Sequence, residues 1–167
     1  SMFSCYSGCR QYRENIIQAR EEVGEGAPLV EKVRMGFNHP GFIAAMADNV
    51  TKASQTIDAS PAETKVLFTA HSIPMGMADN CDYEKQLRES CRLVADACGA
   101  VDWDLVYQSR SGPPSQPWLE PDVLDAIAEM DDAKKLESLV ILPIGFVSDH
   151  MEVLFDLDEE AAQLCQE

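Results

Sequence analysis

Short apolar segments alternate along this chain with longer segments in which apolar residues recur at helical spacing. The pattern predicts strands at 65–70, 104–108 and 139–144, with a further strand expected at 32–37. It predicts helices at about 9–23, 41–53 and 83–97, and another whose first turn contains Pro121. Because strands alternate with helices, parallel pairing with right-handed crossovers is favoured. The predicted fold class is α/β, a doubly wound parallel sheet of about four strands flanked by helices.

Polar side chains gather where two of these strands end. The strand at 139–144 breaks at Pro143 and Gly145, and Ser, Asp, His and Glu residues open the next helix. The strand at 65–70 runs directly into His71. Open α/β sheets bind ligands at the carboxyl ends of their strands, so His71 and Glu152 are candidate site residues. Imidazole exchanges protons near neutral pH and binds metals. A purely structural role for His71 stays open.

Three carboxylates follow this junction at spacing i, i+4 and i+8: Glu152, Asp156 and Glu160. Carboxylates at this spacing repel each other by a few tenths of a kcal/mol per pair, roughly, if exposed, which suggests that a cation binds there. An α-helix drifts by about 40° over each such step, so the three groups align only if a wider π turn intervenes. The alternative is a solvated acidic face near a helix N-terminus, where the macrodipole favours carboxylates.

Composition and charge restrict the class of protein. The chain has 167 residues and 46% apolar content, enough for one sizeable core. No apolar run approaches the roughly 20 residues that span a membrane, and no signal peptide is visible, so we expect a cytoplasmic protein. The net charge of −16 excludes nucleic acid as a partner. No glycine-rich phosphate loop is present, so a nucleotide is not implied.

The six cysteines form neither a C-x-x-C pair nor a zinc-like spacing. In a cytoplasmic protein, free and mostly buried thiols are the expected state.

Five segments, in this order, resemble the ferrochelatases, which insert ferrous iron into protoporphyrin or coproporphyrin. They are SCYSGCRQY (4–12), TAHSIP (69–74), YQSRSGP (107–113), WLEP (118–121) and PIGFVSDHMEVLFDLD (143–158). The resemblance covers virtually the whole chain.

The resemblance implies a role for particular residues. His71 and Glu152 are the expected catalytic pair, facing each other across the porphyrin centre, with His71 either proton acceptor or metal ligand. The expected ligands for Fe²⁺, the substrate metal, are His71, Glu152, Asp156 and Glu160. Porphyrin contacts are expected from Tyr6, Tyr12, Ile73 and Ser109. Gln108 and Ser109 are expected on the floor of the cleft. His150, two residues before Glu152, is interpreted as a residue that orients the site.

Some bacterial ferrochelatases carry a [2Fe–2S] cluster, and Cys9 lies in the segment that supplies one ligand. The other ligands would follow Glu167, so a cluster is a hypothesis for the intact protein and not for this segment.

The resemblance is to part of a family member. Residues 1–57 resemble the end of the first domain, including a helix that lines the porphyrin cleft, and 58–167 resemble most of the second domain. Ser1-Met2 is typical of a cloning remnant. The expected partners are the porphyrin and the absent N-terminal domain, without which we expect this segment to be inactive and to self-associate.

Two other functions stay open. One is a chelatase for another metal or tetrapyrrole, such as cobalt. The other is a non-catalytic, acidic metal-binding domain, against which the presence of both His71 and Glu152 argues.

Overall fold

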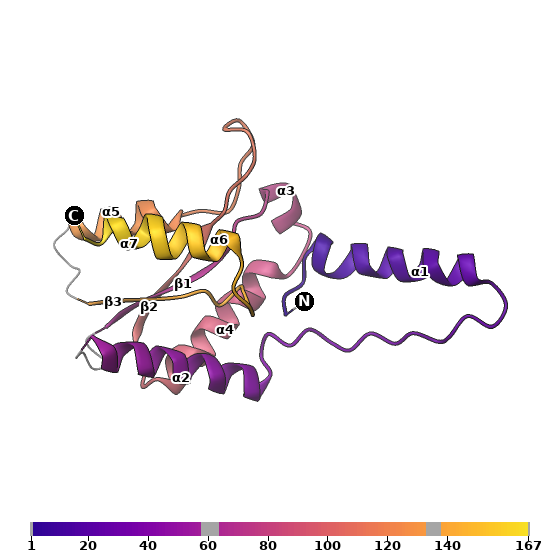
Figure 1. The fold of residues 1–167 in the computed structure, drawn as a ribbon, viewed down its shortest axis with the longest axis horizontal. Helices are drawn as coiled ribbons and strands as arrows, with labels where there is room; N and C mark the ends of the chain where they lie inside the picture. Colours follow the sequence, from indigo (N-terminus) through magenta and orange to yellow (C-terminus); the bar gives the residue numbers. More distant parts are fainter. Residues whose placement is uncertain (1, 58–63, 133–137, 167) are drawn as a thin grey trace.

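The computed structural model of the chain describes residues 2–57, 64–132 and 138–166. Its centre is a parallel sheet in the order β2-β1-β3, formed by β1 (Lys65–His71), β2 (Asp102–Gln108) and β3 (Leu139–Leu142) (Figure 1). His71 pairs in register with Gln108, and Lys65 pairs with Leu139. The predicted α/β class and parallel sheet are therefore confirmed, with three strands in the described residues.

The prediction of a strand at 32–37 is wrong. This segment belongs to no strand of the described structure, and its residues from 32 to 34 are exposed. Its composition suits a strand, but a strand also needs a neighbouring strand to receive its backbone hydrogen bonds. The strand predicted at 139–144 ends early, at Leu142, because Pro143 lies in a turn that Ile144 closes by donating to the Leu142 carbonyl at 2.8 Å.

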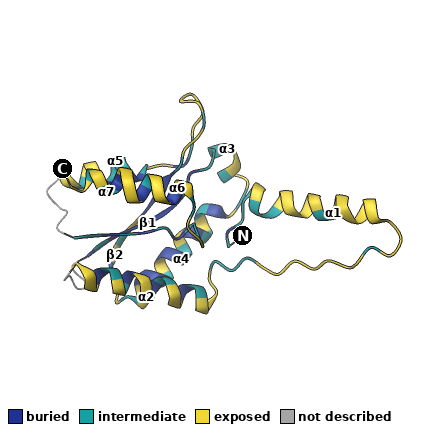
Figure 2. Cartoon of the chain, in the orientation of Figure 1, coloured by how far each residue is buried: buried dark blue, intermediate teal, exposed yellow. Residues whose placement is uncertain are grey.

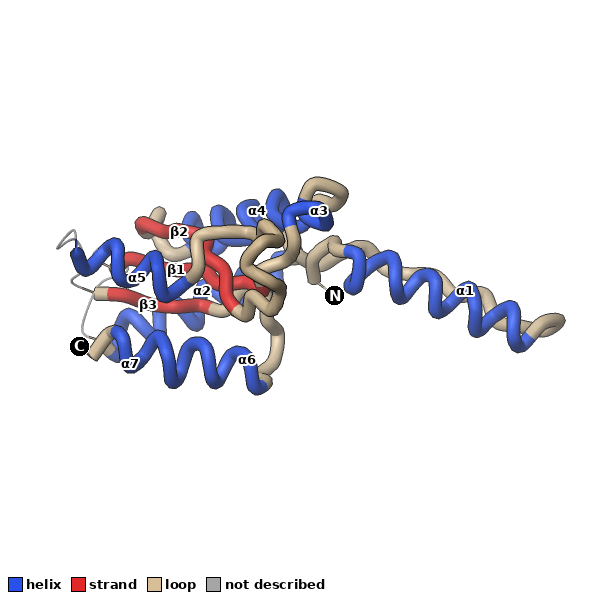
Figure 3. The backbone as a smooth tube through the Cα atoms, turned by 90° about the horizontal axis from the view of Figure 1, so that it is seen from above, coloured by secondary structure: helices blue, strands red, loops and turns tan. Residues whose placement is uncertain are grey.

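Helices cover both faces of the sheet (Figures 1 and 3). On one face, α2 (Pro40–Thr56) and α4 (Tyr83–Ala97) pack against each other and against the strands. On the other face lie α5 (Val123–Asp132) and a continuous helical segment formed by α6 (Met151–Val153), η3 (Leu154–Ala161) and α7 (Ala162–Leu164). The short helix α3 (Met75–Ala78) follows β1.

The strand alternation explains the two cores. In β1, Phe68 packs with Val50 and Leu87 on the α2–α4 face, whereas Leu67 packs with Val123 and Leu157 on the opposite face. These residues are fully or almost fully buried, as expected of a parallel sheet covered on both sides.

Polar side chains cap two of these helices. The His39 imidazole accepts a hydrogen bond from the Gly41 amide at 3.1 Å, and Pro40 occupies the first turn of α2. The helix predicted to contain Pro121 instead begins at Val123. The reason is that the Asp122 carboxylate accepts the Leu124 amide hydrogen at 2.9 Å, which makes Asp122 the capping residue.

The end of the sheet opposite His71 carries its own ion pairs. The Lys65 ammonium lies 3.0 Å from an Asp102 carboxylate oxygen and 2.8 Å from one of Asp104, and its side chain is 19% exposed.

An arm, defined here as residues 6–35, projects from this body (Figures 1 and 2). It consists of the π-helix η1 (Tyr6–Arg10), the helix α1 (Gln11–Val23) and an extended return segment. Neither helix has a buried residue. At its base, the buried Phe3 ring packs edge-on against the rings of Phe42 and Tyr83.

The predicted boundary between residues 57 and 58 adjoins 58–63, which lie outside the described residues. None of the helices in the described part of the chain has the length and apolar character needed to cross a membrane.

Candidate functional site

Two titratable side chains meet at the carboxyl edge of the sheet. His71 is the last residue of β1, and Glu152 lies in α6. The His71 Nε2 is 3.7 Å from a Glu152 carboxylate oxygen. The two side chains are 34% and 50% exposed, so both are accessible to a ligand. The structure therefore brings together the two residues that the sequence singled out.

The turn before α6 depends on a glycine. The Gly145 amide donates to the Thr69 carbonyl at 3.0 Å, which ties the turn to β1. A Cβ atom at this position would lie 2.8 Å from the Ala70 Cα, closer than atoms normally approach. Glycine is therefore needed for the chain to cross β1 at this distance and deliver Glu152 to the sheet edge.

Backbone contacts orient the His71 ring. Its Nδ1 is within hydrogen-bond distance of the Ser72 carbonyl. Because a carbonyl can only accept, the contact assigns the hydrogen to Nδ1. In the neutral ring, the Nε2 lone pair then faces Glu152.

Tyr83 holds the backbone at the same point. Its hydroxyl donates to the His71 carbonyl at 3.1 Å. Burial raises the pKa of Tyr83, so this hydroxyl stays protonated and remains a donor.

A second imidazole approaches Glu152. The His150 Nδ1 lies 3.8 Å from the same Glu152 carboxylate oxygen that faces His71. The His150 ring packs against Phe146, with ring centroids 4.9 Å apart. Glu152 therefore faces one histidine from β1 and another from the turn that precedes its own helix.

The carboxylate sequence continues into a π-helix. The segment η3, which contains Asp156 and Glu160, has π geometry along its whole length. This is the wider turn that the alignment of the three carboxylates requires. Within the described residues, no group of three or more His, Cys, Asp or Glu side chains is arranged to hold a metal ion.

Asp156 is held from the end of β2. Its Oδ2 accepts hydrogen bonds from the Ser109 hydroxyl and, at 3.2 Å, from the Gln108 side-chain amide. Ser109 has a φ of 60°, which is strained for a residue other than glycine. The sequence indicated Ser109 as a porphyrin contact, and in this structure its hydroxyl bonds to Asp156.

The sequence did not predict which partners the Gln108 side chain binds. This side chain is 1% exposed and bonds to the Glu152 backbone carbonyl at 3.4 Å as well as to Asp156. The available signal was an amide at the end of an otherwise apolar strand that adjoins the His71 strand.

The other residues expected to contact porphyrin do not line one shared cavity. Tyr12 and His150 both line a cavity of about 550 Å³, together with Gly145. Tyr6 lines a different cavity, of about 410 Å³. Ile73 follows the His71 strand, and its carbonyl accepts the Leu119 amide hydrogen at 3.0 Å.

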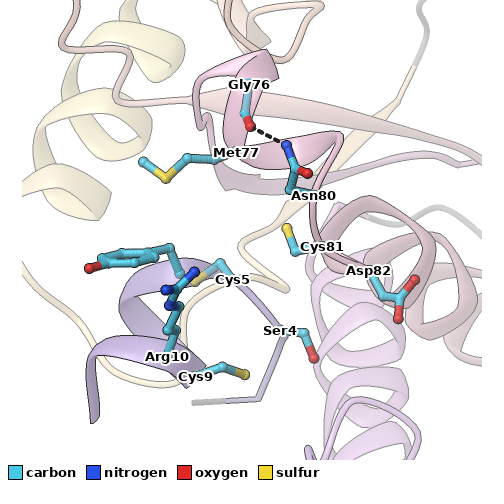
Figure 4. Close-up of a pocket in the computed structure, with 10 residues that line it drawn as sticks. Ser4, Cys5, Cys9, Arg10, Gly76, Met77, Asn80, Cys81 and Asp82 are labelled. Carbon is cyan, nitrogen blue, oxygen red and sulfur yellow. Dashed lines mark hydrogen bonds between the residues drawn. The ribbon is translucent and has the colours of Figure 1, made fainter. Parts of the chain in front are cut away.

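Sulfur atoms surround the cavity that contains Tyr6 (Figure 4). Cys5, Cys9 and Cys81 line it, and the Cys9 thiol is 3.8 Å from the Met35 sulfur. Burial raises the pKa of Cys81. All six cysteines are free, but Cys91 alone is buried, so the prediction of mostly buried thiols is wrong. The reason is that Cys5, Cys9 and Cys81 line an open cavity, whereas Cys91 faces the core.

A protein-family model described as Ferrochelatase matches residues 1–167. The chain is 97% identical over 167 residues to the protein named Ferrochelatase from Rhodopirellula baltica, with 100% of this chain and 48% of that protein covered. It is 46% identical over 171 residues to the Coproporphyrin III ferrochelatase of Mycobacteroides abscessus, covering 100% of this chain and 49% of that protein. It is 44% identical over 170 residues to the protein of the same name from Nocardia farcinica, covering 96% and 48%. The chain thus spans about half the length of the curated relatives it matches.

Proposed function

Because the chain belongs to the ferrochelatase family, we propose that the protein containing it is a metal chelatase, a lyase that inserts Fe²⁺ into a porphyrin in haem biosynthesis. The observation that carries this proposal is the pairing of His71 Nε2 with the Glu152 carboxylate, 3.7 Å apart at the open edge of the sheet.

Metallation replaces two pyrrole protons with a divalent cation. A neutral imidazole can accept one of these protons, and the orientation of His71 leaves its Nε2 as the accepting atom. The Glu152 carboxylate supplies the negative charge that stabilises the protonated imidazole, and it can receive the second proton for release to water. His150, 3.8 Å from the same carboxylate, helps to fix its position.

Asp156 and Glu160 extend the acidic surface away from this pair along η3. Carboxylate oxygens are suitable ligands for a hydrated divalent cation before it reaches the porphyrin. The proposed path for Fe²⁺ therefore runs along the π-helix to Glu152.

The porphyrin is proposed to lie over the sheet edge, in contact with Tyr6, Tyr12, Ile73 and Ser109. Bending the macrocycle exposes the nitrogen lone pairs and needs a second surface, which the half of the protein outside this chain would provide. The names of the relatives from Mycobacteroides abscessus and Nocardia farcinica favour coproporphyrin III as the substrate. Cys9 is proposed as a [2Fe–2S] ligand in the intact protein only.

Anaerobic metallation, followed by porphyrin absorbance, tests the proposal on the full-length protein that carries this segment. His71→Ala and Glu152→Gln should each lower kcat by about 10²- to 10⁴-fold. Glu159→Gln, on the same helical segment and exposed, is the matched control and should keep the wild-type kcat. Full-rate turnover by either site variant would remove that residue from the mechanism. Assays with Co²⁺ and Zn²⁺, and with both porphyrins, distinguish ferrochelatase from a chelatase for another metal.

A further inference from the structure

We propose that Gln108 is a positioning residue that sets the affinity of the acidic helix for the incoming metal ion. The inference rests on the proposed function, because it assigns Gln108 to support two of the residues in the proposed Fe²⁺ path.

Gln108 joins the two structural elements that form the site. As the last residue of β2, it pairs in register with His71, and its backbone carbonyl accepts the Ser72 amide hydrogen at 2.8 Å. Its side-chain nitrogen reaches the other element, at 3.4 Å from the Glu152 carbonyl oxygen and 3.2 Å from the Asp156 Oδ2. The residue therefore fixes the distance between the His71 strand and the acidic helix.

The neighbours determine which way the amide faces. The Glu152 carbonyl is an acceptor only, and the Asp156 Oδ2 already accepts from the Ser109 hydroxyl, so the NH₂ group of Gln108 points toward both. Its Oε1 is then the opposite atom, and it is buried without a hydrogen-bond partner among the described residues. An unpaired buried acceptor lowers stability, and a leucine of similar size would avoid this cost. The donation of hydrogen bonds by the NH₂ group to Glu152 and Asp156 explains why this position is a glutamine.

The hydrogen bonds from Gln108 leave carboxylate oxygens for the proposed metal ion. The Gln108 amide and the Ser109 hydroxyl both donate to Oδ2 of Asp156, so the carboxylate is held by one oxygen and Oδ1 remains for a cation. Glu152 is held through its backbone carbonyl, which leaves its carboxylate to His71 and His150. Hydrogen bonds of this kind to ligating carboxylates typically change metal affinity by about 10- to 100-fold.

Two substitutions at Gln108 test the proposal. Gln108→Leu keeps the approximate size and removes the donor, and Gln108→Met keeps the unbranched shape and also removes the donor. Thr69→Val is the matched control, because Thr69 is fully buried on the neighbouring strand and its hydroxyl also has no partner in the described structure. The measurements use the full-length protein and are the dissociation constant for Co²⁺ alone, by calorimetry, and the separate KM values for Fe²⁺ and porphyrin.

Both Gln108 variants should weaken Co²⁺ binding and raise the KM for Fe²⁺ by about 10- to 100-fold. The KM for porphyrin should stay within about twofold, and Thr69→Val should match the wild type in all three constants. A folded Gln108→Leu protein with wild-type Co²⁺ affinity, or with equal increases in both KM values, overturns the proposal. If Gln108→Leu does not fold, Gln108→Met decides by the same criteria. A wild-type protein without chelatase activity would contradict the proposed function instead, whereas the Co²⁺ measurement tests Gln108 in either case.

Discussion

The Tyr83 hydroxyl donates to the backbone carbonyl of His71, the residue whose imidazole faces Glu152, at 3.1 Å. Tyr83 lies in the first turn of α4, so this hydrogen bond connects the α4 face of the sheet to the site. Tyr83 also packs on Phe3 at the base of the arm. One buried side chain of α4 therefore contacts both Phe3, at the base of the arm, and the strand end that carries the imidazole.

Removing this hydroxyl should destabilise the protein. Tyr83→Phe leaves the His71 carbonyl without its donor, and the free energy of unfolding should fall by about 0.5–1.5 kcal/mol. Urea unfolding measures this change. Tyr107→Phe is the matched control, since the buried Tyr107 hydroxyl has no partner in the described structure and its loss should be neutral or stabilising. Equal destabilisation by the two substitutions would show that the bond to His71 contributes nothing specific.

Neutralising Asp156 should affect the metal more than the porphyrin. Asp156→Asn removes a negative charge from the proposed Fe²⁺ path, so the KM for Fe²⁺ should rise by about tenfold or more, with a smaller change for porphyrin. Steady-state kinetics at varied concentrations of each substrate measure the two constants. Asp158→Asn, an exposed residue two positions later, should leave both unchanged. A similar change in both KM values would favour the solvated acidic face instead.

A methyl group at Gly145 should displace the turn that delivers Glu152. Gly145→Ala would place a Cβ 2.8 Å from the Ala70 backbone, and we expect a loss of about 1–3 kcal/mol in stability together with a lower kcat. Gly76→Ala is the control, because a Cβ at Gly76 meets nothing within 4 Å. Thermal unfolding and metallation assays on both variants provide the comparison, and a Gly145→Ala protein with wild-type stability would show that the turn can move without cost.

This chain alone should self-associate and should not metallate porphyrin. The arm exposes apolar side chains, with Ile17 49% and Leu29 78% exposed, and such surfaces tend to acquire a partner. Sedimentation velocity should detect oligomers, and Ile17→Glu with Leu29→Glu should weaken their association by about tenfold or more, roughly 1.4 kcal/mol. Val147→Glu, which alters an exposed apolar residue outside the arm, should have a smaller effect. A monodisperse, active monomer would contradict both expectations.

The sequence was sufficient to predict the sheet because β1 is buried on both sides and both β1 and β3 have a nearly continuous apolar character. It was also sufficient to predict that His71 and Glu152 lie at the same edge of the sheet. His71 ends one parallel strand, and Glu152 lies in the helix that follows another. The structure of the segment 32–37 could not be predicted in the same way. Its composition suits a strand, but whether a neighbouring strand is available to pair with it depends on the tertiary structure. The hydrogen bonds of the Gln108 side chain could not be predicted for a related reason, because they depend on Asp156, which lies 48 residues away in the chain.

The carboxylates at the two ends of the sheet pair with different kinds of basic side chain. At the amino end, the Lys65 ammonium forms ion pairs with both Asp102 and Asp104 and offsets one of their two charges. At the carboxyl end, the ion pairs of Glu152 among the described residues are with His71 and His150, which carry charge only when protonated. A divalent cation from solvent therefore competes with the ammonium group of Lys65 for the carboxylates at the amino end. At the carboxyl end it competes with the imidazoles of His71 and His150 for Glu152, and these are charged only when protonated. Burial lowers the pKa of Lys65, but hydrogen bonds to Asp104 and Asp102 raise it by more, so the charge of Lys65 persists. Such an ion therefore competes for Glu152 more readily than for those two carboxylates whenever both histidines are neutral.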